Sequence, residues 1–449
     1  MKNVHIISLG CARNLVDSEV MAGLLNKEGY SFTAEANKAD LILVNTCGFI
    51  KEAKQESIDT ILEAAEFKNP KKGRCQKLVV AGCMAERYPG ELKESLPEID
   101  LVMGTASFNR IVEAVDKLDI QSSDSAGPQI FAPPAERLKD YDLPRLNSQP
   151  FYTAFLKLAE GCAKRCSFCI IPKLRGPLRS RSINTLIKET QDLVNTGVTE
   201  LNLIAQDLTD YGRDRKDGAT LAGLLRELVK IEKLKWIRLF YVYPDQLSDE
   251  VIELIKSEDK ICKYLDVPVQ HISNSILEGM NRKTTGQDIR RVVSDLKKKI
   301  PDIVLRTSLM VGFPGETAQD FDELESFVRE GHFDHIGVFT YSEEEGTPSA
   351  EKFKDDLSEK TKESRKNKIQ LLQSKVSSEK LKEYIGQEIE VLIEGHHPET
   401  ELLLKGRHFG QAPSVDNLTL IQEGTAKVGD YVKVKITEIA GNDLVGRIV

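Results

Sequence analysis

The sequence predicts an α/β protein of three successive units: an N-terminal doubly wound parallel sheet, a central partial (β/α) barrel and a small C-terminal antiparallel β-barrel. Three observations support this prediction. A chain of 449 residues is too long for one hydrophobic core. Short apolar runs alternate with amphipathic stretches up to about residue 350, which is typical of parallel sheets. After residue 381 only short strands with Gly and Asn turns remain, as in small barrels.

The first unit is expected to span residues 1–120. Its predicted strands are the apolar runs VHIISLG, DLILVNTCG, KLVVAGCM and DLVMGT. Amphipathic stretches between these runs have helical periodicity. Residues 121–150 contain Pro, Ser and Gly without periodicity, so we expect a linker there.

The second unit is expected to span residues 151–380. Its predicted strands are YTAFLKLA, VTELNLIAQD, KWIRLFYVYP, KYLDVPVQ, IVLRTSLMVGFPG and HIGVFTYS. Six strand–helix units suit a partial barrel, and barrel chemistry sits at the carboxyl ends of the strands. Residues 350–382 are charged and lack Gly and Pro, which predicts one long helix with a solvated face.

The third unit, residues 381–449, contains seven basic and eleven acidic residues. RNA binding depends largely on basic side chains that neutralise phosphates, so this acidic unit is poorly suited to RNA. An acidic surface would attract a basic protein instead. The alternative interpretation is that the charges only keep the unit soluble.

Whole-chain composition indicates a globular protein in the cytoplasm. The formal net charge is −8, and the N-terminal apolar run is too short for a signal peptide. No apolar run approaches the roughly 18 residues of a membrane span, so we expect no membrane partner. Eight cysteines in a reducing compartment favour metal or redox chemistry over a disulfide framework.

Three cysteines form the densest motif of the chain. Cys162, Cys166 and Cys169 follow the first predicted strand of the central unit at CxxxCxxC spacing. Three thiolates at this spacing can bind three irons of a cubane cluster and leave the fourth iron open for reaction. A zinc knuckle with a remote fourth ligand and chance clustering are the alternatives.

A second group of cysteines is spread over the N-terminal unit. Cys11, Cys47 and Cys83 each follow a predicted strand, next to a Gly. The carboxyl ends of parallel strands meet at one sheet edge, so these thiols can converge and bind a second cluster. Alternatively, all three are buried cysteines that act as small hydrophobic side chains. Cys75 and Cys262 have no partner pattern and are expected to be structural thiols.

The CxxxCxxC motif, with Phe168 before its last cysteine, resembles the radical S-adenosylmethionine superfamily. The resemblance implies that the open iron chelates S-adenosylmethionine and that its reductive cleavage gives a 5′-deoxyadenosyl radical, which abstracts hydrogen. With Cys11, Cys47 and Cys83 added, the whole chain resembles the radical methylthiotransferases. The resemblance then implies two 4Fe-4S clusters, a barrel of the radical S-adenosylmethionine type, a TRAM-like C-terminal barrel and the replacement of a C–H bond by C–SCH₃.

Two branches of this family differ in substrate: an adenosine derivative in tRNA, or the β-carbon of an aspartate on small-subunit ribosomal protein twelve. Resemblance favours the protein branch and makes nucleic acid an unexpected direct substrate. The segments that carry this resemblance are SLGCARNLVDSE, NTCGFIKEAKQES, CIIPKLRGPLRSRS, QDLTDYGRD, ICKYLDVPVQHIS and FTYSEEEGTPSA. That branch more often has Pro and Lys where this chain has Ala12 and Arg13. A sulfur donor and a reductant such as a flavodoxin-like carrier are the further implied partners.

Candidate S-adenosylmethionine contacts are placed by position and resemblance at the ends of the central strands, with ordinary barrel packing as the alternative. They are Phe168, Gln206, Pro268, Gln270, His271 and Arg306. No catalytic side chain is expected beyond the cluster ligands. Arg175, Arg179 and Arg181 could bind a carboxylate of cofactor or substrate, or lie on a solvated surface loop.

Overall fold

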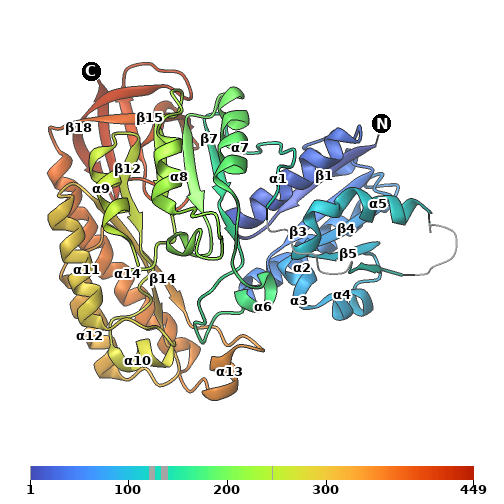
Figure 1. Cartoon of the computed structure of the whole chain (residues 1–449), viewed down its shortest axis with the longest axis horizontal. Coiled ribbons are helices and arrows are strands. Elements are labelled where there is room, and N and C mark those ends of the chain that lie inside the picture. Colours follow the sequence, from blue (N-terminus) through green and yellow to red (C-terminus); the bar gives the residue numbers. More distant parts are fainter. Residues whose placement is uncertain (1, 121–126, 133–139, 245) are drawn as a thin grey trace.

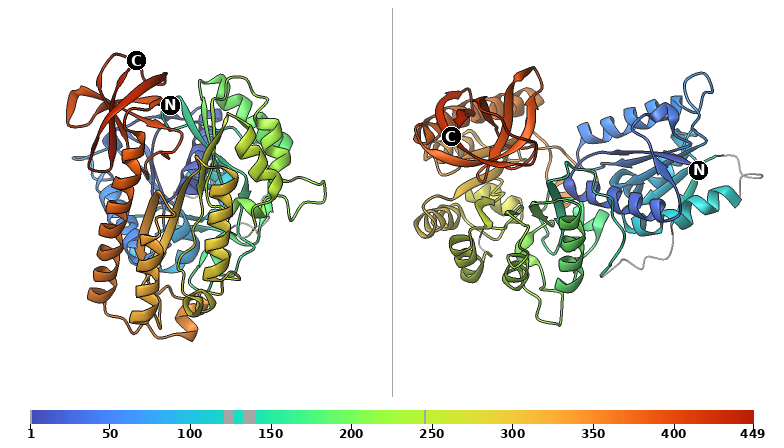
Figure 2. Two further views of the ribbon diagram at one scale, coloured as in Figure 1. Left: turned by 90° about the vertical axis from the view of Figure 1, so that its left-hand side faces the viewer. Right: turned by 90° about the horizontal axis from the view of Figure 1, so that it is seen from above.

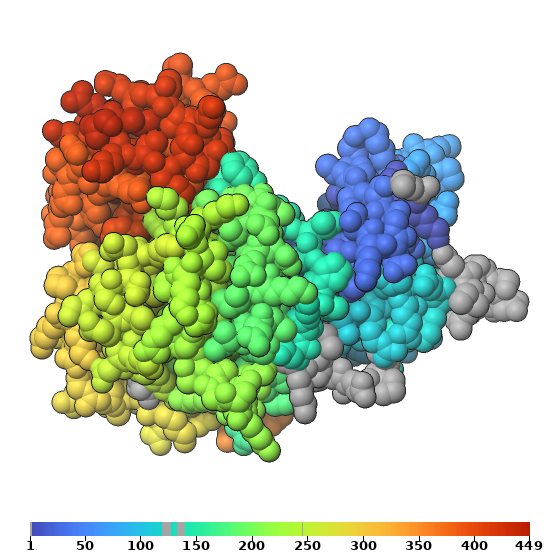
Figure 3. Space-filling model, turned by 45° about the horizontal axis from the view of Figure 1, so that its top comes forward, coloured from blue at the N-terminus to red at the C-terminus, as the bar shows by residue number. Residues whose placement is uncertain are grey.

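The computed structural model describes residues 2–120, 127–132, 140–244 and 246–449. It contains two six-stranded sheets and one closed barrel, in the order that the sequence predicts. The N-terminal sheet lies to one side of the central sheet, and the C-terminal barrel lies at one end of the central sheet (Figures 1 and 2). In the space-filling view the C-terminal barrel rests on the central unit and stands apart from the N-terminal unit (Figure 3).

The N-terminal sheet has the strand order β2-β1-β3-β4-β5-β6 and is parallel throughout. Its strands are β1 (Asn3–Ser8), β2 (Ser31–Phe32), β3 (Leu41–Thr46), β4 (Lys77–Gly82), β5 (Leu101–Gly104) and β6 (Gln129–Phe131). Its helices are α1 (Ala12–Lys27), α2 (Lys51–Glu66), α3 (Cys83–Arg87), α4 (Pro89–Ser95) and α5 (Ile111–Ile120). One core contains α1 and α5, and a second contains α2 and α4. Helices therefore cover both faces, and the doubly wound prediction is confirmed.

The expected linker 121–150 contains one element of this sheet. Strand β6 lies within it and pairs with β5, because Ile130 and Phe131 supply a short apolar run beside the exposed edge of β5. Residues 121–126 and 133–139 of the expected linker lie outside the described residues. The domain boundaries drawn from the sequence remain predictions.

The central sheet has the order β14-β13-β12-β11-β10-β7, so successive strands of the chain are neighbours and all pair in parallel. Its strands are β7 (Thr153–Lys157), β10 (Glu200–Ile204), β11 (Trp236–Leu239), β12 (Ile261–Asp266), β13 (Val304–Val311) and β14 (His335–Thr340). Its helices are α6 (Ile171–Arg175), α7 (Ile183–Asn195), α8 (Leu221–Leu228), α9 (Asp249–Ser257), α10 (Asn274–Gly279), α11 (Gly286–Lys299) and α12 (Ala318–Arg329). β8 (Ala159–Glu160) and β9 (Arg179–Ser180) pair as a separate ribbon. This is the predicted partial barrel.

The long helix predicted for residues 350–382 is wrong at its start. α13 (Pro348–Lys352) ends first, and α14 (Glu359–Leu381) begins only after Ser358, whose side chain accepts the N–H of Thr361. The Lys362 ammonium is buried and pairs with Asp355 in the segment between the helices. This cap and this ion pair favour a chain turn over a continuous helix.

The C-terminal barrel is closed, in the order β15-β16-β17-β19-β18. Its strands are β15 (Glu388–His397), β16 (Thr400–His408), β17 (Thr419–Glu423), β18 (Tyr431–Ala440) and β19 (Asp443–Ile448). All its pairings are antiparallel except the parallel pair β17–β19. The predicted small barrel is confirmed, with that one parallel contact as an addition. No helix among the described residues is long and apolar enough to span a membrane.

A buried ion pair fixes the C-terminal barrel to the amino ends of the central strands. Arg407 on β16 donates to both carboxylate oxygens of Glu200 on β10, at 2.9 and 2.7 Å, and neither side chain is exposed. Arg238 on β11 lies 3.3 Å from the same carboxylate and also donates to the Phe409 carbonyl. The carboxyl ends of the strands are therefore at the opposite end from this joint.

Replacing Arg407 by methionine should destabilise the protein by about 3–5 kcal/mol, because the Glu200 carboxylate stays buried without its main partner. The free energy of unfolding in denaturant measures this effect. Arg447→Met is the control, since Arg447 is exposed on the same barrel. A loss for Arg407→Met no larger than that of the control would contradict the buried joint.

Candidate functional site

The three N-terminal cysteines lie at one edge of their sheet, as predicted. Cys11 precedes α1 after β1, Cys47 follows β3, and Cys83 begins α3 after β4. These three strands are adjacent and parallel, so their carboxyl ends meet. A Cβ added at Gly10 would lie 3.0 Å from the Cys47 sulfur, which shows how closely the loops approach. Glycine therefore permits the close contact between the Cys11 and Cys47 loops.

Burial and charge act in opposite directions on these thiols. Burial raises the pKa of Cys83 to about 11, although the charge of Arg175 opposes the rise. Burial would also raise the pKa of Cys11, but the charges of Arg13 and Arg175 outweigh it and the pKa is lowered. Two guanidinium groups thus lie close enough to the N-terminal thiols to stabilise negative charge there.

The CxxxCxxC loop is tied to α6 and to its own backbone. The Cys162 N–H donates to the Gly176 carbonyl at 3.1 Å, and the Lys164 N–H lies 3.4 Å from the Cys162 sulfur. The Cys169 N–H donates to the Cys166 carbonyl at 3.2 Å, so the loop is tightly turned. Burial raises the pKa of Cys162 to about 11 and that of Cys169 to about 12, and neighbouring cysteines add to both shifts. The three thiols therefore lie close enough together on this loop to interact electrostatically.

The donor chemistry of both triads fits iron–sulfur clusters. All six cysteines are free thiols, and five of them keep partly exposed surface, Cys83 being buried. No group of three or more Cys, His, Asp or Glu side chains in the described ranges surrounds a point that could hold one metal ion. In a cubane each cysteine ligates a different iron, so a triad for a cluster does not need to converge on one ion.

Helix α6 connects the two triads. Its neighbour Ile170, directly after Cys169, packs with Leu174 against Cys83 and Phe49 of the N-terminal unit. The next residue after Leu174, Arg175, reaches the N-terminal triad itself. Its Nη2 donates to the Asn14 side-chain oxygen at 2.7 Å and lies 3.7 Å from the Cys83 sulfur. One short helix therefore carries both a cluster loop and a contact to the other thiols.

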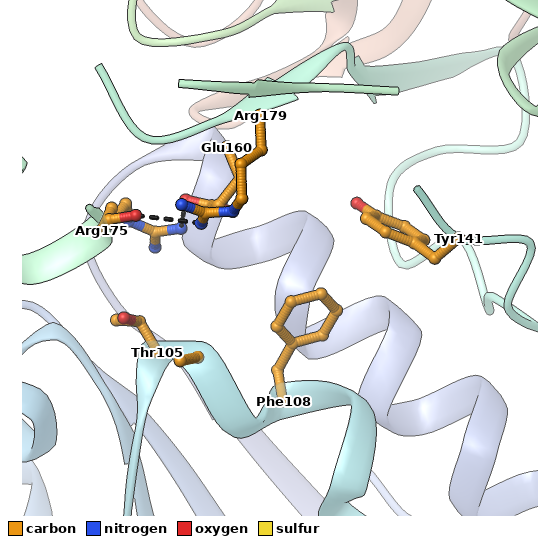
Figure 4. Close-up of a pocket in the computed structure, with 7 residues that line it drawn as sticks. Thr105, Phe108, Tyr141, Glu160, Arg175 and Arg179 are labelled. Atoms are coloured by element: carbon orange, nitrogen blue, oxygen red, sulfur yellow. Dashed lines mark hydrogen bonds and ion pairs between the residues drawn. The ribbon is translucent and has the colours of Figure 1, made fainter. Parts of the chain in front are cut away.

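Arg175 is also the centre of a buried charge network. Its Nη1 donates to Asp17 of α1 at 3.0 Å and to Glu160 at 2.8 Å. Lys157 pairs with the same two carboxylates. Figure 4 shows Arg175 facing Glu160 beside a small pocket that Thr105, Phe108, Tyr141 and Arg179 also line. The pocket lies at this joint between the two units.

The structure contradicts the surface-loop interpretation for two of the three arginines after the cluster loop. Arg175 and Arg181 are each 2% exposed. Arg181 pairs with Glu189 at 2.6 Å, and Arg175 pairs with Asp17 and Glu160. Their carboxylate partners are internal, so neither guanidinium is available to a ligand. Arg179 donates to the carbonyls of Pro177 and Arg175 and holds the loop.

Several predicted cofactor contacts lie where the carboxyl ends of the central strands meet. Gln206 follows β10, and its Nε2 is buried without a hydrogen-bond partner in the described structure. Gln270 follows β12 with a φ of 70°, and its backbone bridges to β13 through Ser308 and Met310. The Pro268 carbonyl accepts from Arg282 at 2.8 Å. Phe168 packs against a buried cluster that contains Phe313 and Tyr341.

His271 and Arg306 are engaged within the protein. His271 is 0% exposed, and its Nδ1 accepts the N–H of Ser273, which places the proton on Nε2, 3.7 Å from Glu316. Arg306 pairs with Asp266 at 3.2 Å and with Asp416 of the C-terminal barrel at 3.3 Å. Each side chain therefore has one structural contact, while the Nε2 of His271 and the Nε of Arg306 are buried without a hydrogen-bond partner in the described structure.

Two buried histidines make stability depend on pH. Burial lowers the pKa of His271 to about 4 and that of His408 to about 3. The unfolded chain binds these protons near pH 6.5, so stability is full above that pH and falls as the pH decreases towards the folded-state values. At pH 5 each histidine should cost about 2 kcal/mol relative to neutral pH.

Unfolding in denaturant at pH 7 and pH 5 measures this loss. His408→Gln should reduce the difference between the two pH values by about 2 kcal/mol, because the protonation of one histidine no longer contributes. His396→Gln, at an exposed site, is the control. Equal pH dependence in wild type and His408→Gln would contradict the buried neutral state.

Sequence reasoning missed several residues of the site. Asn14, Asp17 and Ser18 are buried polar residues on α1, and their spacing places them on one helix face. That spacing is the signal that could have predicted a polar joint. Tyr241 and Arg13, which stack on each other across the joint between the units, carried no local signal because they are 228 positions apart. Cys75 and Cys262 are both buried, as structural thiols are expected to be.

Comparisons with family models match each unit separately. The uncharacterized protein family UPF0004 matches residues 3–104, the Radical SAM superfamily matches residues 156–328, and the TRAM domain matches residues 385–449. Among solved structures, a radical S-adenosylmethionine methyltransferase, TsrM from Kitasatospora setae, is 16% identical. It superposes with a TM-score of 0.56 over 75% of this chain and 73% of that chain. The cobalamin-dependent radical enzyme OxsB gives a TM-score of 0.53 at 14% identity over 84% of this chain and 56% of that chain. These likenesses show the fold alone.

Full-length relatives are much more similar. The ribosomal protein uS12 methylthiotransferase RimO of Geotalea uraniireducens is 50% identical, covering 100% of this chain and 98% of the relative. The protein of the same name from Pelobacter propionicus is 49% identical with the same coverage, and that from Bdellovibrio bacteriovorus is 45% identical. Identity at this level over the whole length places all three units in one family. The chain belongs to the RimO family of ribosomal protein uS12 methylthiotransferases.

Proposed function

We propose that this protein is a radical enzyme that methylthiolates the β-carbon of an aspartate on ribosomal protein uS12. The observation that carries the proposal is the joining of two cysteine triads, on two different parallel sheets, by the short helix α6. The CxxxCxxC triad lies in the region that the Radical SAM superfamily matches, and the N-terminal triad lies in the region that UPF0004 matches. The full-length relatives, which are named for uS12 methylthiolation, support the reaction and the protein substrate.

As a member of the Radical SAM superfamily, the protein uses S-adenosylmethionine and an iron–sulfur cluster. In our proposal there are two 4Fe-4S clusters, one held by Cys162, Cys166 and Cys169 and the other by Cys11, Cys47 and Cys83. When bound, the clusters and S-adenosylmethionine would supply two things. One is a 5′-deoxyadenosyl radical, which removes a hydrogen atom from the substrate; the other is the methylthio group that takes the place of that hydrogen. The six thiols hold the clusters, and the surrounding side chains fix their separation and limit access of water.

Four side chains at the strand ends are retained as proposed S-adenosylmethionine contacts: Phe168, Gln206, Pro268 and Gln270. The unpartnered Nε2 of Gln206 is a donor for a polar ligand group, since a buried N–H without an acceptor is costly. The left-handed backbone of Gln270 is strained and is held by two β13 contacts, which suits a site that fixes a ligand. His271 and Arg306 remain proposed contacts as well, since the buried Nε2 of His271 and Nε of Arg306 also lack a hydrogen-bond acceptor in the described structure.

Charge on the C-terminal barrel supports a basic protein partner. Arg407 is buried in its pair with Glu200, so it contributes nothing to the surface charge. Exposed acidic residues remain on several strands and turns of the barrel, among them Glu388, Glu390, Glu399, Glu401, Glu423, Asp430 and Glu438. This surface is poorly suited to phosphates and steers basic proteins towards the enzyme. The tRNA alternative is therefore not favoured.

A reductant is required because radical S-adenosylmethionine chemistry begins with one-electron reduction. We propose a flavodoxin-like electron carrier and a separate small-molecule or protein sulfur donor. Anaerobic turnover with candidate carriers, measured as 5′-deoxyadenosine formed, identifies the reductant. A carrier that supports no 5′-deoxyadenosine formation is excluded.

The substrate assignment is tested by incubating the reconstituted enzyme with uS12 and, separately, with unmodified tRNA. Intact mass should show one added SCH₂ unit on uS12, and fragmentation should place it on an aspartate. Addition to the tRNA alone would contradict the protein assignment. Metal analysis of the purified protein tests the alternative that the CxxxCxxC loop is a zinc knuckle. That alternative requires bound zinc and little iron.

A further inference from the structure

Arg13 crosses from the N-terminal unit into the central barrel. It is the second residue of α1, and its Nη1 donates to the Ala205 carbonyl at the end of β10, at 2.8 Å. Its guanidinium carbon lies 4.5 Å from the ring centre of Tyr241. The Arg13 charge acts on Cys11 of one triad and on Cys169 of the other. The guanidinium therefore lies where α1 of the N-terminal unit meets the carboxyl end of β10, near thiols of both triads.

The Arg13 cation lacks a carboxylate partner. No Asp or Glu within the described ranges pairs with it, and its Nε is buried without a hydrogen-bond acceptor. Other buried arginines of the same joint are paired: Arg145 with Glu19 at 2.5 Å, and Arg175 with Asp17 at 3.0 Å. A buried N–H without an acceptor is costly unless a ligand group accepts its hydrogen bond. Arg13 keeps partly exposed surface, so a ligand can reach it.

Backbone strain holds the ring beneath this guanidinium. Tyr241 has a φ of 59°, a conformation that a bulky L-residue rarely adopts. Two hydrogen bonds fix it, from the Leu208 N–H to the Tyr241 carbonyl at 2.9 Å and from the Val242 N–H to the Asp266 carbonyl at 2.8 Å. Such strain costs about 1–3 kcal/mol and concentrates at functional sites. The aromatic face stabilises the cation without satisfying its N–H groups.

We propose that Arg13 binds the side-chain carboxylate of the acidic substrate residue. This inference rests on the proposed function and names the group that recognises the substrate. The reacting carbon must lie between the radical source and the sulfur source, and the carboxylate of an aspartate is one bond from its β-carbon. A guanidinium that lies near thiols of both triads and binds the carboxylate through two N–H groups therefore orients that carbon.

S-Adenosylmethionine is the other carboxylate source. We assign Arg13 to the substrate because it lies on α1 of the N-terminal unit, two residues after Cys11, on the sulfur side of the site. Arg282 provides a matched comparison: its Nε is also buried without a partner among the described residues, and it stacks on Tyr243 at 4.4 Å. Arg282, however, lies in the central unit and donates to the Pro268 carbonyl.

The test measures binding of two fluorescent peptides that carry the target segment of uS12, one with the native Asp and one with Asn. The cluster-loaded enzyme is held anaerobically with S-adenosylmethionine and without reductant. Wild type should bind the Asp peptide at least about tenfold more tightly than the Asn peptide. Arg13→Met should weaken Asp-peptide binding by about 10–100-fold and remove the preference. Arg13→Lys should retain part of it, and Arg282→Met should retain all of it.

Several outcomes would overturn the assignment. The assignment fails if Arg13→Met keeps the preference for the Asp peptide, or if wild type shows no preference. It also fails if Arg282→Met loses the preference to the same extent as Arg13→Met. Weaker binding of S-adenosylmethionine with unchanged peptide binding would assign Arg13 to the cofactor, and a loss of iron would assign it to cluster retention. If wild type binds with the Asp preference but adds no SCH₂ to uS12, the proposed function fails and the carboxylate site stands.

Discussion

Replacing Cys47 by alanine is expected to abolish methylthiolation of uS12 while reductive cleavage of S-adenosylmethionine continues. Cys47 lies at the end of β3 with the other N-terminal thiols, on a different sheet from the CxxxCxxC loop. Removing it leaves two thiols for the N-terminal cluster and does not touch the loop that binds the other cluster. Radical formation and sulfur insertion should therefore separate.

Two measurements on the same samples show whether the two activities separate. Chromatography measures the 5′-deoxyadenosine formed, and mass spectrometry measures the SCH₂ added to uS12. Methylthiolation should fall by more than about 100-fold, the size of effect expected when a reacting group is lost. Cys166→Ala should lose both activities, and Cys75→Ala should lose neither, because Cys75 is buried away from both triads and donates to the Lys77 carbonyl. Loss of both activities in Cys47→Ala with full iron content in the CxxxCxxC loop would refute the division of labour.

Arg175→Met is expected to have the second large effect: it should destabilise the protein and disturb the joint that holds the two triads together. The change removes the cation that pairs with Asp17 and Glu160 and that contacts Asn14 and Cys83. Lys157 alone remains beside the two buried carboxylates. Breaking a buried ion network in this way costs about 3–5 kcal/mol. Methylthiolation should decrease more than S-adenosylmethionine cleavage, because the loss affects the separation of the triads.

Unfolding in denaturant measures the stability loss, and the ratio of SCH₂ added to 5′-deoxyadenosine formed measures the coupling. Arg175→Lys keeps the charge and should recover part of both. Arg179→Met is the control four residues further along the chain, where the side chain donates to the Pro177 and Arg175 carbonyls. A normal ratio in Arg175→Met at a temperature where the variant is folded would argue against a positioning role.

Much of the fold could be predicted because its signals are local. The run LILVNT is buried at every position in β3, and such runs alternating with helices indicate a parallel sheet. The convergence of Cys11, Cys47 and Cys83 then followed from strand geometry alone. The helix break before Ser358 was missed because a cap and an ion pair with Asp355 outweigh the helical composition.

The joints between units could not be predicted from the sequence. Glu200 and Arg407 are 207 positions apart, and Arg13 and Ala205 are 192 apart. No spacing rule links such pairs, because they depend on how separately folded units dock. His271 shows the same limit: the sequence indicates only its position after a strand, whereas its contacts with Ser273 and Glu316 depend on the fold.

The iron content of the anaerobically reconstituted protein tests the central claim, that both triads hold a cluster, most directly. Wild type should contain about eight irons per chain. Replacing one triad by alanines should leave about four irons, whether the triad is Cys11, Cys47 and Cys83 or Cys162, Cys166 and Cys169. About four irons in wild type, with none lost when the N-terminal cysteines are replaced, would contradict this claim.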